Sequence, residues 1–146
     1  MNHWKSLLYL VAILLNTAYC TNSRKVEEAA EDRLRTELMQ VHDEVMPRMG
    51  EMTGIAGQLK DFLQQDSLLS ADDRLQLEEA IGEITAAEEG MMDWMAGFRQ
   101  PETLRASMDH EEIMKYLESE KNKITRVNVQ IKAGIEKGKA LVLTYQ

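Results

Sequence analysis

The sequence predicts an all-α protein: an antiparallel three-helix up-down-up bundle with coiled-coil-like packing and a protruding N-terminal helical stalk. Three observations predict this class. Charged residues make up 29% of the 146-residue chain and aromatic residues only 5%. Prolines number only 2. Apolar residues recur every three or four positions, which is typical of long helices with a narrow buried seam rather than of a sheet.

Residues 1–20 predict an export signal, with Lys5 before an apolar run at 7–15. That run is shorter than the about 20 apolar residues that cross a bilayer. Cys20, the single cysteine, stands where a bacterial lipoprotein carries its lipid; the alternative is a secretory signal cut after Cys20. We therefore expect an exported protein, membrane-anchored and facing the periplasm or cell surface, or else soluble in the periplasm or secreted. One cysteine excludes an intramolecular disulfide.

The first helix is expected from Arg24 to about Gln65, with a kink at Pro47 because proline removes a backbone donor and crowds the preceding turn. Gly50 and Gly54 then share one face, which suggests either a close helix contact or a flexible point. Its apolar seam comprises Leu34, Leu38, Val41, Val45, Met52, Ile55, Leu59 and Phe62.

The second and third helices carry N-terminal capping signals. Ser70 with Asp73 is expected to cap the second, and Asp109 with Glu112 the third. The second seam comprises Leu77, Ile81, Ile84, Met91, Met95 and Phe98. The third comprises Ile113, Leu117, Ile124, Val127, Ile131 and Leu141.

Short connections make neighbouring helices antiparallel. Counting outward from the turns places residue 42 near 94, 48 near 88, and 88 near 119. The second helix then reaches back only to about Leu38. The expected division is 1–20 signal peptide, 21–37 linker or stalk, and 38–146 three-helix bundle. The overhang from 24 to 37 would project roughly 20 Å as a stalk, unless it is a frayed charged terminus.

The same counting brings three charged seam residues together: Arg48, Glu88 and Glu120. Burying one such charge alone costs several kcal/mol, so they should pair. We expect a buried ionic layer that fixes helix register. The alternative is a functional proton or ligand site.

One end of the bundle collects sulfur and imidazole side chains. Such ligands suit Cu(I), and an indole face can lie against a cation. The alternative is that methionine fills gaps beside the kinked helix, with no cofactor. The group comprises Met39, His42, Met46, Met49, Met91, Met92, Asp93, Trp94, Met95, Met108, His110 and Met114, of which a copper site would use His42, Met46, Met49, Met92 and Met95.

Composition and motifs exclude other classes. Without residues 1–20 the chain has 16 basic against 25 acidic residues, a net charge of −9. Such a surface argues against nucleic acid. The sequence has no Glu-x-x-His pair for a di-iron bundle, no glycine-rich phosphate loop, no nucleophile elbow and no zinc spacing. We expect no enzymatic activity and no small-molecule substrate.

Three stretches, 42–50, 91–95 and 111–117, carry a resemblance: His-Asp-Glu-Val-Met-Pro-Arg-Met-Gly, Met-Met-Asp-Trp-Met and Glu-Glu-Ile-Met-Lys-Tyr-Leu. Over roughly residues 24–142 the chain resembles small exported bacterial proteins, commonly predicted lipoproteins, that often carry the label "viral A-type inclusion protein". The resemblance implies export and a helical fold, and no activity. The leading hypothesis is a non-enzymatic structural or interaction module that binds an envelope protein, with a periplasmic Cu(I)-binding protein as the alternative.

Overall fold

The computed structural model describes the backbone of residues 3–65 and 69–146, and the side chains of residues 23–65 and 69–146. Every regular element in these ranges is helical, and four of the helices, α1, α2, α3 and α5, pack together. The all-α prediction is confirmed. The elements are α1 His3–Val45, the 3-10 turn η1 Met46–Arg48, α2 Met49–Gln65, α3 Ala71–Gly97, α4 Pro101–Leu104 and α5 His110–Tyr145.

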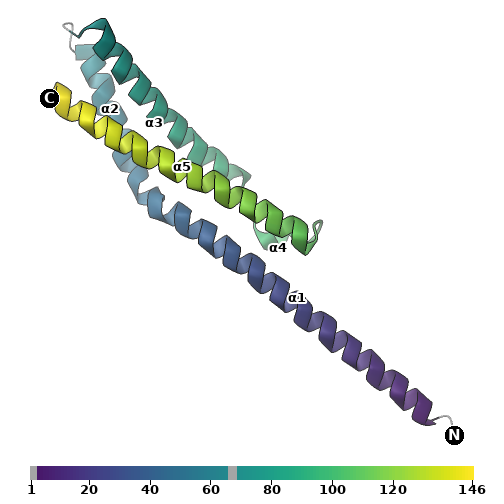
Figure 1. Ribbon diagram of the computed structural model, residues 1–146. Coiled ribbons are helices and arrows are strands. Elements are labelled where there is room, and N and C mark those ends of the chain that lie inside the picture. The colour runs from purple at the N-terminus through teal and green to yellow at the C-terminus, as the bar shows by residue number, and fades with distance from the viewer. Residues whose placement is uncertain (1–2, 66–68) are drawn as a thin grey trace.

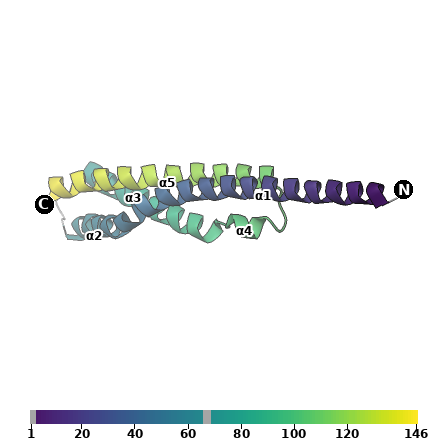
Figure 2. The same ribbon diagram turned by 90° about the horizontal axis from the view of Figure 1, so that it is seen from below.

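The molecule is elongated, and its two termini lie at opposite ends (Figure 1). Helix α5 lies along the C-terminal part of α1 at one end and along α2 and α3 at the other. Figure 2 shows α1 and α5 side by side, with the N-terminal part of α1 extending past the start of α5. Within the described part of the chain, no helix combines the length and apolarity needed to cross a membrane.

The predicted interruption at Pro47 is confirmed. The chain passes from α1 into the three-residue 3-10 turn, whose second residue is Pro47. It then continues into α2 in a new direction (Figure 1). Proline has no N–H to donate to the preceding turn, so the regular α-helical ladder stops there.

Both predicted caps are confirmed as capping boxes. The Ser70 hydroxyl accepts from the Asp73 amide at 3.1 Å, and the Asp73 carboxylate accepts from the Ser70 amide at 3.2 Å. Asp109 and Glu112 make the same reciprocal pair at 2.9 and 3.0 Å. These local signals fix where α3 and α5 begin.

The predicted seams form the core. Most of their residues are buried, and the others, such as Val41 and Leu141, are partly buried against the core. The core also includes buried residues outside the predicted seams, among them Ala80, Ala87, Trp94, Ile135 and Val142.

Of the two alternatives for Gly50 and Gly54, the close helix contact is wrong, because a Cβ at either position would meet nothing within 4 Å. The close approach lies on α5 instead. A Cβ at Gly138 would collide with Ile55 Cγ2, and one at Gly134 would lie 3.3 Å from Ile84 Cγ1. Glycine on α5 therefore lets α2 and α3 pack closely against it.

The predicted register holds on one side of the kink only. His42 and Trp94 are adjacent, with ring centroids 5.5 Å apart. Beyond η1, Thr53 rather than residue 48 faces Glu88, with a hydrogen bond of 2.5 Å between them. The second count also fails, because a Cβ at Gly90 would lie 3.4 Å from Val127, about ten residues beyond the expected level.

The predicted overhang of residues 24–37 is also corrected. Glu31 in this segment is only 2% exposed, and Glu37 is bonded to Lys121 of α5. The physical reason is length: α5 has 36 residues and α3 only 27, so α5 and the connection before it cover α1 well upstream of Leu38.

Candidate functional site

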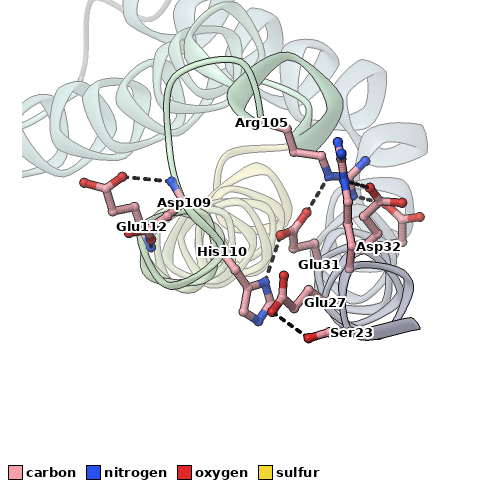
Figure 3. Close-up of polar contacts among 10 residues, drawn as sticks. Ser23, Glu27, Glu31, Asp32, Arg105, Asp109, His110 and Glu112 are labelled. Carbon is pink, nitrogen blue, oxygen red and sulfur yellow. Dashed lines mark hydrogen bonds and ion pairs between the residues drawn. The ribbon is translucent and has the colours of Figure 1, made fainter. Parts of the chain in front are cut away.

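The most buried charged side chain of the described residues is Glu31 on α1. Its Oε2 accepts a hydrogen bond from Arg105 Nε at 2.7 Å, and its Oε1 is 2.8 Å from His110 Nδ1. In Figure 3, Arg105 and His110 reach the Glu31 carboxylate from two sides. Arg105 lies in the connection after α4, and His110 is the first residue of α5. One carboxylate thereby joins three segments of the chain.

Helix periodicity explains the burial of Glu31. It lies three residues before Leu34 and seven before Leu38, so it continues the apolar stripe of α1. A buried carboxylate without partners would cost several kcal/mol, which makes both donors necessary. The Asp109 cap starts α5 at His110, and Arg105 directly follows the one-turn α4, so local structure delivers both donors.

Electrostatics keep Arg105 charged. Burial opposes its charge, but the hydrogen bond and charge of Glu31, with the charges of Asp32 and Glu28, outweigh burial and raise the pKa of Arg105 above its ordinary value. Its second contact is a 3.4 Å pair with Asp32.

An open pocket of about 550 Å³ adjoins this cluster. His110 is partly exposed beside the pocket. Because an ionised carboxylate only accepts hydrogen bonds, Nδ1 of His110 carries the proton and donates to Glu31. The other ring nitrogen, Nε2, is not bonded to this carboxylate. The Ser23 hydroxyl donates to Glu27 at 3.4 Å (Figure 3). The pocket is lined by Ser23, Arg24, Glu27, Glu28, Glu31, Arg105, Met108, Asp109 and His110.

Chemically, this arrangement is an ion-pair clasp that fastens the α4–α5 connection to α1. Among the described side chains, the contacts of His110 include no hydroxyl or thiol that it could activate. No group of three or more His, Cys, Asp and Glu residues in the same part of the chain is placed to hold a metal ion.

Of the predicted copper ligands, His42 lies beside Trp94, and the methionines differ in exposure. His42 Nδ1 is 2.8 Å from Asp43, and its ring lies against Trp94. Met46, Met49 and Met95 are partly buried against the core, whereas Met92 is 59% exposed. Copper binding stays a prediction.

The predicted ionic layer is wrong. Arg48 pairs with Glu51 on its own helical stretch at 3.2 Å, and Glu120 pairs with Lys123 at 2.7 Å. Glu88 accepts from Thr53. Arg48 and Glu120 thus pair with residues three positions along the chain, and Glu88 bonds to a hydroxyl of α2, because the register beyond the kink differs from the count that placed the three together.

A second candidate surface is the groove between α2 and the C-terminal part of α5, about 500 Å³ in volume. Leu143 on its edge is 77% exposed, and the open glycines of α2 form part of its wall. Hydrogen bonds from Lys139 and Arg48 lower the pKa of Glu51 at the rim. The lining comprises Gly50, Glu51, Gly54, Ile55, Gln58, Lys139, Val142, Leu143 and Gln146.

Sequence reasoning missed Glu31 and Arg105, and it placed His110 among methionines instead of beside a carboxylate. The available signal was a charge three residues before the first seam leucine. The predicted lipidation residue, Cys20, lies outside the residues whose side chains are described.

Comparisons with protein-family models, curated proteins and solved structures give no match. The resemblance to exported proteins of the predicted lipoprotein kind therefore stays a prediction.

Proposed function

We propose that this chain is a non-enzymatic, exported helical module that binds another protein of the cell envelope. A lipid on Cys20 anchors it, or it is secreted after removal of the leader. Its finer fold is a three-helix up-down-up bundle in which α1 and α2 form one kinked helix. Contacts of α5 with α1, α2 and α3, and of α2 with α3, support this topology. Because processing removes the residues before Cys20, the stalk would be reduced to the few residues of α1 between Cys20 and Ser23.

The observation that carries the proposal is the α2–α5 groove. Its rim charges, Glu51 and Lys139, pair with one another, so the rim carries little net charge. Gly54 leaves open space along its wall, and Leu143 stands exposed beside it. Grooves of this kind take the apolar face of a partner helix, and burying one leucine contributes about 1.5–3 kcal/mol. The expected occupant is therefore an amphipathic helix of an envelope protein.

Glycine substitutions on α2 test this. Gly54→Leu places a side chain in the groove, and Gly57→Leu is the matched control because Gly57 also faces open space but does not line the groove. A photo-crosslinking residue at position 143 should give a discrete protein adduct in the native envelope. We expect the adduct with the unsubstituted chain and with Gly57→Leu, and its loss with Gly54→Leu.

Thermal unfolding of both variants checks that each remains folded. The same adduct in all three proteins would show that the groove is not the binding surface. The absence of any adduct in the unsubstituted chain would remove the support for a partner at this groove.

A further inference from the structure

A groove between α1 and α5, separate from both surfaces above, has an apolar floor and charged ends. Its volume is about 600 Å³. Val26 on its floor is 64% exposed, and the neighbouring positions Ala29 and Ala30 are small. The lining comprises Lys25, Val26, Ala29, Ala30, Arg33, Leu34, Glu37, Met114 and Glu118.

The two ends of this groove carry opposite charges, and Arg33 lies between them on α1. Lys25 lies at the upstream end. Glu37 lies at the other end, where it bonds Lys121 at 2.6 Å, and Glu118 lies one turn before Lys121 on α5. Among the ion pairs of the described side chains, none includes Lys25 or Glu118. An exposed apolar strip thus has an unpaired cation near one end and an unpaired carboxylate near the other.

We propose that this groove is the interface of a two-fold antiparallel dimer of the chain. When a second copy lies in the opposite direction, Lys25 of each copy meets Glu118 of the other, and the two pairs are equivalent by symmetry. A parallel copy would instead set Lys25 against Lys25, which like-charge repulsion disfavours.

The floor of the groove suits the centre of such an interface. Ala29 and Ala30 lie near the midpoint between Lys25 and Glu37, where a two-fold axis would pass. Small side chains there let two helices approach to the short end of the usual 8–10 Å separation. Val26 of each copy would then be covered.

Interface size sets the strength of the dimer. Residues 25–37 form only about 18 Å of helix. A contact of that length is too short to bury the roughly 800 Å² per partner of a standard interface. The dimer is therefore weak in solution and favoured where a membrane concentrates the chain. In an antiparallel pair the two Cys20 positions lie at opposite ends, so two lipid anchors would hold the α1 helices flat along one membrane.

Charge reversal tests the pairing. Sedimentation equilibrium of the processed protein from its host, in density-matched detergent, should show a concentration-dependent dimer. Lys25→Glu and Glu118→Lys should each raise the dissociation constant about tenfold. An equimolar mixture of the two variants should restore dimerisation, because the charges at positions 25 and 118 are then opposite in both contacts of the mixed dimer.

Lys60→Glu is the matched control, since it makes the same charge change on an exposed face of α2 outside the groove. It should leave the dimer unchanged, and circular dichroism should show all variants folded. A strictly monomeric unsubstituted protein would overturn the proposal. So would single variants that dimerise normally, or a double variant, Lys25→Glu with Glu118→Lys on one chain, that fails to dimerise with itself, because its charges are complementary only in antiparallel pairing.

Discussion

The two ends of α5 are held by different kinds of contact. Near its N-terminus, α5 is fastened to α1 by the clasp of Glu31, Arg105 and His110. Near its C-terminus, α5 packs against α2 and α3 by close approach of Gly138 to Ile55 and of Gly134 to Ile84. The clasp depends on the charge and orientation of its side chains, whereas the glycine contacts depend on the shape of the packed surfaces.

This difference shows how one helix can position two sets of neighbouring segments. A buried carboxylate tolerates few alternative partners, so it specifies where the α4–α5 connection lies on α1. Closely packed glycine and isoleucine set the distance between helix axes, and they tolerate no added volume. Substitutions at each end should therefore fail for different reasons.

The largest effect is expected from Glu31→Ala. It leaves Arg105 partly buried without its main acceptor, and breaking a buried pair in this way costs about 3 kcal/mol, at the low end of the usual range because Arg105 keeps 20% exposure. Chemical denaturation followed by circular dichroism measures the loss. Glu31→Gln, which keeps the size and one acceptor, should lose less. A Glu31→Gln variant as stable as the unsubstituted chain would show that size, not charge, holds this end.

A smaller loss is expected from Gly138→Ala at the other end. The added Cβ meets Ile55 and Ile84, costing about 2 kcal/mol of overpacking, against a gain of about 1 kcal/mol in helix propensity. The net loss is about 1 kcal/mol. Gly57→Ala has open space and should instead gain up to about 1 kcal/mol. Stabilisation by both substitutions would contradict the close contact on α5.

The smallest effect is expected from lowering the pH, which should weaken the contacts at both ends of α5 to a similar extent. Lys121, Lys132 and Lys139 of α5 bond Glu37, Glu44 and Glu51, and these hydrogen bonds lower the pKa of each carboxyl below its ordinary 4.5. A carboxyl with a lowered folded pKa stabilises the fold above its unfolded value, and that contribution disappears as pH falls. The melting temperature should therefore decline below about pH 4.5.

Replacing these three glutamates by glutamine provides the control for the acid effect. The triple variant should show a shallower decline of melting temperature between neutral and acid pH than the unsubstituted chain. An identical decline would assign the acid sensitivity to other carboxyls.

Local features of this fold were predictable from sequence, and long-range ones were not. Pro47, Ser70 and Asp109 act on neighbouring backbone, so their effects follow from nearby residues. Register across the bundle depends on how many residues the turns and η1 consume, which no local pattern states. The Arg48 layer failed for that reason. The contact of Glu31 with His110 joins residues 79 positions apart and has no local signature beyond a charge on an apolar stripe.

The 3-10 turn at Met46–Arg48 has a consequence for cooperativity of unfolding. Because the α-helical ladder is interrupted there, opening of α1 need not propagate through backbone hydrogen bonds into α2. Native-state hydrogen exchange should resolve two opening units, one containing α1 and the other α2 with α3. Helix α5 belongs to both, so its middle amides should exchange only when the whole chain unfolds.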